Sequence, residues 1–269
     1  MNMPISMTRH TNLRRHFLWI LCCTFLFFST HHAYAYKQET LLLCVDHYPP
    51  LQIIQPNGQV TGENVEVAKA FAKAANYRLE FTPNTPFKRC LQWLKQGKVD
   101  MMVGLLNSQE RDQTLNMFLY DKETVKTVFL SQSAADVTTL DDLKGKRVGL
   151  VRGVKQFEAF DHRKEQDFEL IYVNNLESAF GMLAKKRVEA VICTDYYGHN
   201  ILRQNPAYSS QIRQASFEVT QGTEVYIGIS KRANVKNIDK FNEIAEDMLR
   251  TKQFRQIMDE FKRTHPQYY

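Results

Sequence analysis

Long hydrophobic runs are missing from this 269-residue sequence beyond its first 35 residues. The run from Phe17 to Phe28 has 12 residues, whereas an α-helix needs about 20 to cross a bilayer. Three arginines precede this run, and the small-residue sequence Ala-Tyr-Ala follows it and ends at Ala35. This order is typical of a secretory signal peptide. The sequence therefore predicts a signal peptide over 1–35 and a soluble chain exported to the periplasm.

Cysteine is also scarce, and two of the five cysteines fall inside the predicted signal peptide. The other three are Cys44, Cys90 and Cys193, in a compartment that permits disulfides. One interpretation is a disulfide between Cys44, in a predicted strand, and Cys90, in a predicted helix. The other is that all three are small buried hydrophobic residues. The chain has no C-x-x-C and its eight histidines are scattered, so we expect no metal site and no cofactor.

Basic and acidic side chains are close to balanced after the predicted signal peptide. Removing the signal peptide leaves 32 basic and 29 acidic side chains, a net charge of +3. There is no basic stripe interleaved with aromatic residues, so the sequence does not predict nucleic-acid binding. There is also no G-x-S-x-G, H-E-x-x-H or phosphate-loop motif, so it does not predict an enzyme.

Short apolar runs alternate with amphipathic segments from Thr40 onward, which is the pattern of α/β units. The length suits one large domain or two lobes of roughly 100 residues each. Strands are expected at 41–45, 78–82, 99–105, 147–151, 168–173, 188–193 and 224–230. Helices are expected at 63–77, 87–96, 140–143, 155–163, 175–187 and 235–262, with Asn175 as an N-cap.

Six segments, in this order, resemble the extracellular solute-binding proteins of family 3, the periplasmic proteins for polar amino acids that feed ABC importers. The segments are "VDHYPPL", "NGQVTGENVEVAKAFAKAANYRLEF", "QGKVDMMVGLLNSQER", "DDLKGKRVGLVRG", "LAKKRVEAVICTD" and "FNEIAEDMLRTKQFRQIMDEF". They cover nearly the whole chain after the signal peptide.

The resemblance implies the type II periplasmic-binding-protein fold, of the α/β class. Two lobes would each contain a mainly parallel sheet flanked by helices, and two hinge strands would join them near 121–130 and 215–225. The first lobe would comprise residues 36–125 plus 220–269, and the second 126–219.

Arg111 stands in the turn after the strand expected at 99–105. The resemblance implies that this arginine, in the family's turn that starts at Gly104, binds the α-carboxylate of the ligand. A guanidinium matches a carboxylate bidentately, and ligands of α/β proteins bind at the carboxyl ends of strands. The alternative is an exposed arginine paired with Glu110 or Asp112.

Asp195 follows the strand expected at 188–193 in the other lobe. The resemblance implies that its carboxylate receives the α-amino group of the ligand. The alternative is an N-cap of the next helix. Tyr48 and Phe87 match aromatic positions beside the ligand's side chain, or they pack in the core. Asp46 contacts a polar end of the ligand or caps the turn before two prolines.

The resemblance also implies that Gly153 begins the first helix of the second lobe, whose free N–H groups could bind the carboxylate. Two residues depart from the family pattern, because Leu106 and Val154 occupy positions where hydroxyl side chains usually help to bind the ligand. Arg89 and Arg152 are further candidates beside the cleft.

The function implied by this resemblance is capture of a small carboxylate-bearing solute, an amino acid or a derivative, by hinge closure. A monomer would then deliver the solute to a membrane ABC permease. Two alternatives stay open. One is a sensor that presents its ligand to a membrane receptor, and the other is a periplasmic dehydratase, which needs a general acid.

Overall fold

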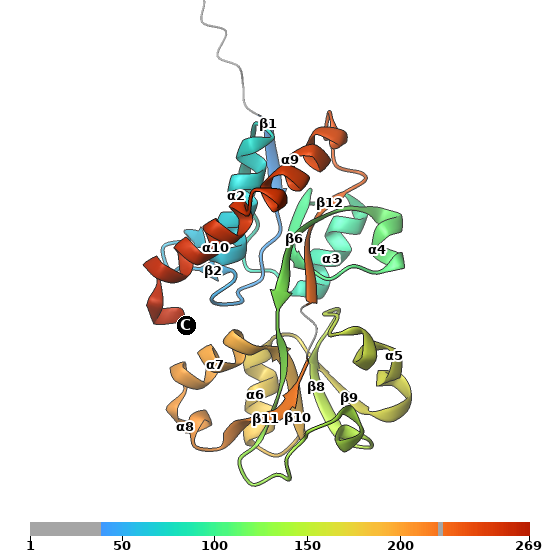
Figure 1. Cartoon of the computed structure of the whole chain (residues 1–269), viewed down its shortest axis with the longest axis vertical. Helices are drawn as coiled ribbons and strands as arrows, with labels where there is room; N and C mark the ends of the chain where they lie inside the picture. The colour runs from blue at the N-terminus through green and yellow to red at the C-terminus, as the bar shows by residue number, and fades with distance from the viewer. Residues whose placement is uncertain (1–38, 220–222) are drawn as a thin grey trace, which may run out of the picture. The chain divides into compact units, whose positions relative to one another are not determined.

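The computed structural model describes residues 39–219 and 223–269 (Figure 1). The predicted signal peptide, residues 1–35, lies outside the described residues. Among the helices that are described, none combines the length and the apolar character needed to cross a membrane.

One five-stranded sheet combines early and late parts of the chain, in the order β4-β1-β5-β12-β6. β1 pairs in parallel with β4 and β5, whereas β12 is antiparallel to β5 and β6. Its strands are β1 (Glu39–Leu43), β4 (Tyr77–Phe81), β5 (Met101–Leu105), β6 (Leu115–Thr124) and β12 (Thr223–Ser230). We call this sheet and its helices the first lobe.

A second five-stranded sheet contains the middle of the chain, in the order β11-β7-β10-β8-β9. β8 is parallel to β9 and β10, and β7 is antiparallel to β10 and β11. Its strands are β7 (Lys126–Ser131), β8 (Arg147–Val151), β9 (Glu169–Val173), β10 (Ala190–Thr194) and β11 (Ile212–Glu218). We call this sheet and its helices the second lobe.

Both sheets are mixed, so the expectation of mainly parallel sheets holds only for the βαβ part of each lobe. The strands that enter or leave a lobe, β6, β7, β11 and β12, add the antiparallel pairs. Val125 alone separates β6 from β7, and Figure 1 shows this segment passing from one lobe to the other. The lobe boundaries expected at 125/126 and 219/220 stay a prediction.

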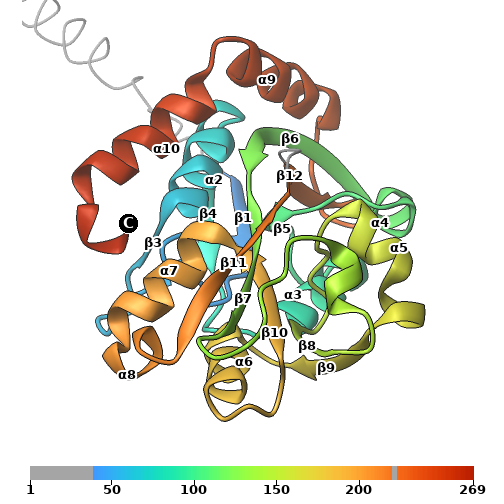
Figure 2. The same cartoon turned by 60° about the horizontal axis from the view of Figure 1, so that its bottom comes forward.

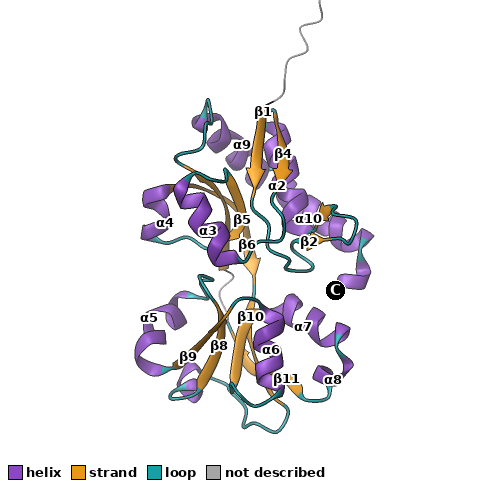
Figure 3. Ribbon diagram, turned by 180° about the vertical axis from the view of Figure 1, so that it is seen from behind, coloured by secondary structure: helices purple, strands orange, loops and turns teal. Residues whose placement is uncertain are grey.

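Helices cover both faces of each sheet (Figure 3). The pattern follows from strand alternation, since Leu41 and Leu43 of β1 face one core cluster while Leu42 and Cys44 face another. On the first side α10 packs on α2 (Figure 2). The first lobe has α2 (Glu63–Ala74), α3 (Phe87–Gln96), α4 (Gln109–Thr114), α9 (Ile238–Arg250) and α10 (Gln253–Thr264), with η2 (Pro266–Tyr268) and the short strands β2 (Ile53–Ile54) and β3 (Val60–Thr61).

The second lobe repeats this layering. Val128 and Leu130 of β7 face one cluster, and Phe129 faces the other. Its helices are η1 (Leu140–Leu143), α5 (Glu158–Asp167), α6 (Leu176–Ala184), α7 (Asp195–Gln204) and α8 (Pro206–Ser209). Asn175 caps α6 as expected, because its side chain accepts a hydrogen bond from the Ser178 amide.

Two helix predictions need correction. The single helix expected over 235–262 is two helices, since Lys252 adopts φ 59°, a left-handed conformation that ends one helix before the next begins. Gly153 does not begin a helix either. It has φ +82°, and α5 starts five residues later, at Glu158. The Asp161 carboxylate in the first turns of α5 accepts a hydrogen bond from the Gln156 amide, which precedes the helix.

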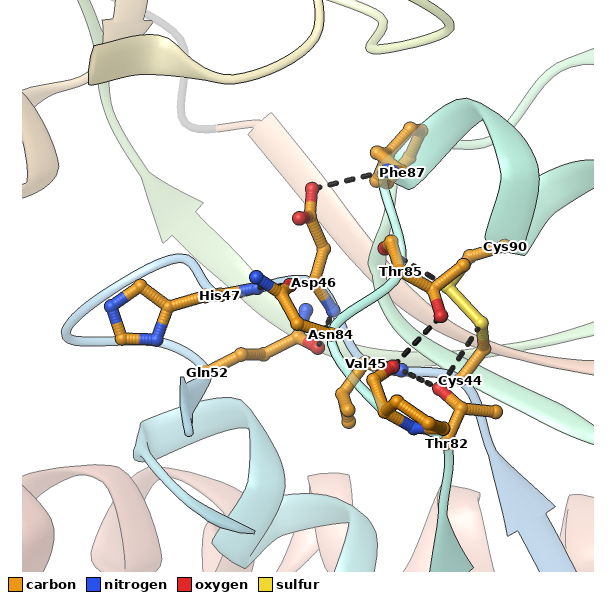
Figure 4. Close-up of a disulfide and its surroundings, with 11 residues drawn as sticks. Cys44, Val45, Asp46, His47, Gln52, Thr82, Asn84, Thr85, Phe87 and Cys90 are labelled. Atoms are coloured by element: carbon orange, nitrogen blue, oxygen red, sulfur yellow. Dashed lines mark hydrogen bonds between the residues drawn. A yellow bond between two sulfur atoms is a disulfide. The ribbon is translucent and has the colours of Figure 1, made fainter. Parts of the chain in front are cut away.

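Cys44 and Cys90 form a disulfide with an S–S distance of 2.01 Å, which joins the end of β1 to α3 (Figure 4). The first of the two interpretations of these cysteines therefore describes this structure. Cys193 remains a free, buried thiol, and burial raises its pKa to about 12. This thiol stays protonated and is a poor nucleophile at neutral pH.

We expect the disulfide to contribute about 4 kcal/mol to the free energy of unfolding, because the two cysteines are 46 residues apart and a loop of that length loses much entropy when it is closed. Urea unfolding of a Cys44→Ala/Cys90→Ala variant measures this difference. A reducing agent should destabilise the wild type and leave the variant unchanged. Equal stability of the oxidised wild type and the variant would contradict the expectation.

Candidate functional site

A cavity lies where the carboxyl ends of strands from the two lobes face each other. Its volume is about 70 Å³, against about 10–15 Å³ for one water position, so it suits a small solute. The first lobe contributes Asp46, Tyr48, Glu63, Asn64, Phe87, Gly104, Leu106, Arg111, Tyr120 and Asp121 to its lining. The second lobe contributes Lys126, Val151, Val154, Lys155, Asn175, Leu176, Thr194, Tyr196 and Tyr197.

Arg111 reaches this cavity from α4, where the Ser108 hydroxyl accepts from its backbone amide and fixes the start of the helix. Only 3% of the residue is exposed. Its guanidinium donates to the carbonyl of Leu106 in the first lobe and to that of Gly153 in the second, the latter at 3.1 Å. Burial lowers its pKa to about 10, so it is still cationic at neutral pH.

The alternative of an exposed Arg111 paired with Glu110 or Asp112 is wrong. Glu110 binds Lys95, with 2.5 Å between carboxylate and ammonium. Among the described residues, the Arg111 guanidinium has no carboxylate partner. Its Cζ atom lies 6.0 Å from the ring centroid of Phe87, and both residues line the cavity.

Tyr48, Phe87 and Asp46 all line the cavity, and their roles in ligand binding stay a prediction. The Tyr48 hydroxyl lies 3.2 Å from the Thr194 hydroxyl of the second lobe, and its ring centroid lies 3.9 Å from that of Tyr197. The Asp46 carboxylate accepts from the Phe87 amide at 3.1 Å (Figure 4). Burial raises the pKa of Asp46 to about 7.

Asp195 is not at the cavity, and the expectation that it lines the site needs correction. Its side chain is 38% exposed and lies 3.4 Å from Nε2 of His199. The cavity-lining residue at the end of β10 is Thr194, one position earlier. A shift of one residue at a strand end turns a side chain to the opposite face. The N-cap alternative is wrong by the same single residue, since Thr194 is the N-cap of α7.

Gly104, Leu106 and Val154 also line the cavity. Gly104 has φ +80°, and a Cβ there would lie 2.8 Å from the Asn64 side-chain nitrogen, so a larger residue would disturb this wall. Gly153 lines an adjoining groove instead, together with Arg152.

Arg152 donates to the carbonyl of Tyr172, and Arg89 is exposed on α3. Neither arginine lines the cavity.

Lys126 also lines the cavity, although it was not among the residues predicted from the sequence. It begins β7, is 4% exposed, and is paired with Thr194 across the antiparallel ladder, so both side chains leave the same face of the sheet. Burial lowers its pKa to about 8. A lysine inside the apolar run "TVKTVFL", at an expected hinge, was the available signal.

Two buried acids were also missed, and both have partners. Glu63 lies 3.8 Å from the Lys262 ammonium and accepts from the Tyr269 hydroxyl at 2.5 Å. Burial raises its pKa. Asp121 lies 3.2 Å from the Arg255 guanidinium.

The segment after α10 contacts both lobes. The Tyr268 carbonyl accepts from the side chains of Asn200 and Arg203 in α7, at 2.9 and 2.7 Å. The Tyr269 ring lies 6.2 Å from that of Tyr196, which lines the cavity, and its hydroxyl binds Glu63 in the first lobe. Residues 266–269 therefore tie α7 to the first lobe.

No group of three His, Cys, Asp or Glu side chains that could hold a metal ion occurs in the part of the chain that the structure describes. The chemistry that the cavity offers is binding by charge and hydrogen bonds, from one guanidinium, two lysine ammonium groups, three carboxyl groups and several hydroxyls and amides.

Known proteins resemble this chain in sequence and in structure. The arginine-binding extracellular protein ArtP of Bacillus subtilis is 24% identical over 214 residues, which are 79% of this chain and 81% of that protein. The histidine-binding periplasmic protein of Escherichia coli K12 is 25% identical over 168 residues, 61% of this chain and 64% of that protein.

A solved ancestral arginine-binding protein bound to arginine matches with a TM-score of 0.70 and 25% identity. The match covers 82% of this chain and 97% of that one. The model of the bacterial extracellular solute-binding proteins, family 3, matches residues 41–264. This match spans both lobes and the cavity between them, and the chain belongs to that family.

Proposed function

We propose that this protein captures an amino acid or a related small carboxylate between its lobes and delivers it to an ABC permease. The relatives are named as binding proteins for arginine and histidine, and the family consists of solute-binding proteins, which supports binding rather than catalysis. Export through the leader at 1–35, a periplasmic location and a monomeric state belong to the same proposal.

The observation that carries the proposal is the buried guanidinium of Arg111. An arginine has five N–H donors, and two of them bind the carbonyls of Leu106 and Gly153. The remaining N–H donors of Arg111 have no carboxylate partner among the described residues. A ligand carboxylate in the cavity would supply the missing anion, with charge-assisted hydrogen bonds that are stronger in a buried site than in water.

Contacts between the two lobes support closure of the lobes around a ligand. Arg111 belongs to the first lobe and bonds a carbonyl of the second, and Tyr48 and Thr194 meet in the same way. A ligand that contacts both walls stabilises the closed arrangement by its differential affinity.

Asp46 is our candidate for the ligand's α-amino group, in place of Asp195. Glu63 and Asp121 line the cavity too, but each is within ion-pair distance of a cation. Asp46 has no cationic partner among the described residues, and an incoming ammonium would favour its ionised form.

We expect Arg111→Ala to weaken amino-acid binding by about 100-fold or more, because the carboxylate would lose its buried cationic partner. Isothermal titration calorimetry against the common amino acids and small organic acids measures this. Arg111→Lys should restore part of the affinity, since an ammonium lacks the planar pair of donors. Arg78→Ala, which removes an exposed arginine of β4, is the matched control. Unchanged affinity in a folded Arg111→Ala variant would disprove the proposed site.

We expect the ligand-free protein to lose stability relative to an Asp46→Asn variant as the pH rises from 5 to 7. Because the pKa of Asp46 is raised from 3.8 to about 7, the folded protein retains a proton in this range that the unfolded chain releases. The free energy of unfolding should fall by up to about 1 kcal/mol per pH unit. Asparagine is the suitable replacement because its side-chain oxygen can still accept a hydrogen bond from the Phe87 amide. Urea unfolding at pH 5, 6 and 7 measures the difference, and a constant difference would show that the pKa is not raised.

A further inference from the structure

Lys126 is a buried cation for which the described residues provide no paired anion. It lines the cavity with 4% of its surface exposed, and within the described residues its ammonium makes no hydrogen bond or ion pair. The acidic groups whose charges act on it are Cys193 and Asp161. Cys193 is a neutral thiol at pH 7, and Asp161 is paired with Lys164 at 3.0 Å.

The acids of the cavity do not offset this charge. Glu63 lies beside Lys262, and Asp121 beside Arg255, so each of these carboxylates already has a cation. Asp46 is half protonated near pH 7, because burial raises its pKa to about 7. The cavity therefore contains two buried cations, Arg111 and Lys126, that have no carboxylate counter-ion among the described residues.

A buried ammonium without a partner is costly, and such costs persist where function requires them. Lys126 is still mostly protonated at pH 7 with a pKa of about 8. An anionic ligand group is the one partner that would remove the cost, and the Thr194 hydroxyl on the same face of the sheet is placed to assist it.

We propose that Lys126 binds a second carboxylate of the ligand, so that this cavity selects small compounds with two carboxylates over the basic amino acids. The inference rests on the proposed function, in which Arg111 binds the first carboxylate. It separates this protein from the relatives named for arginine and histidine, because neither of those amino acids has a second carboxylate.

Calorimetric titration of the purified protein at pH 7 tests the inference. The panel contains L-glutamate, L-aspartate, glutarate and succinate as dicarboxylates, L-glutamine as a neutral analogue of L-glutamate, and L-arginine and L-histidine as basic amino acids. We expect at least one dicarboxylate to bind more tightly than glutamine, arginine and histidine.

Lys126→Met keeps the length and apolar stem of the side chain and removes its charge. We expect it to weaken binding of the preferred dicarboxylate roughly 10- to 100-fold and to leave any binding of glutamine within about threefold. Lys73→Met, at an exposed position on α2, is the matched control and should leave all affinities unchanged.

Thermal unfolding without ligand gives a second readout. If Lys126 is unpaired in the empty cavity, Lys126→Met should unfold at a higher temperature than the wild type, whereas loss of a structural contact would lower that temperature. A lower melting temperature together with unchanged dicarboxylate binding would overturn the inference.

The outcomes also separate this inference from the proposed function. If arginine, histidine or glutamine binds through Arg111 while the dicarboxylates do not, the role of Lys126 is disproved and amino-acid binding stands. If no compound of the panel binds, the role of Lys126 is disproved, and if Arg111→Ala binds the ligand like the wild type, the proposed function fails as well.

Discussion

The buried guanidinium of Arg111, which donates to one carbonyl in each lobe, constrains much of this structure. Arg111 must stay charged there, so the chain has to supply acceptors that are close and oxygen-based. The carbonyl of Gly153 becomes one of them because Gly153 takes a left-handed φ in the loop before α5. Ser108 sets the start of α4 so that the arginine emerges at the carboxyl end of β5. The local conformations on both sides of the cavity are thus tied to one buried charge.

The distribution of charge along the cavity wall is uneven. The acids on the α2 and β6 side are compensated by cations from the C-terminal helix α10, namely Arg255 and Lys262. Arg111 in α4 and Lys126 at the start of β7 have no such compensation within the described residues. A cavity of this kind holds a permanent electric field, and a field fixed before the ligand arrives selects the sign of the ligand.

The sequence alone located most of the secondary structure, because apolar periodicity and capping residues are local signals. The helix expected at 87–96 is α3 with the same bounds, since Gly97 ends it in a left-handed conformation. The placement of Asp195 failed because the direction of a strand-end side chain depends on register, which periodicity cannot fix to one residue. Lys126 went unnoticed because the cost of its burial appears only when two lobes enclose it. The break between α9 and α10 at Lys252 was not predicted because no proline or glycine occurs there.

The disulfide and the bond from Phe87 to Asp46 are two ties between the same pair of segments. Cys44 lies two residues before Asp46, and Cys90 lies three residues after Phe87, so the disulfide joins the same two segments as this hydrogen bond (Figure 4). The oxidation state of the protein is therefore a variable in any affinity measured for it. Material prepared under reducing conditions would lack this link, and thiol titration before calorimetry would distinguish the two preparations.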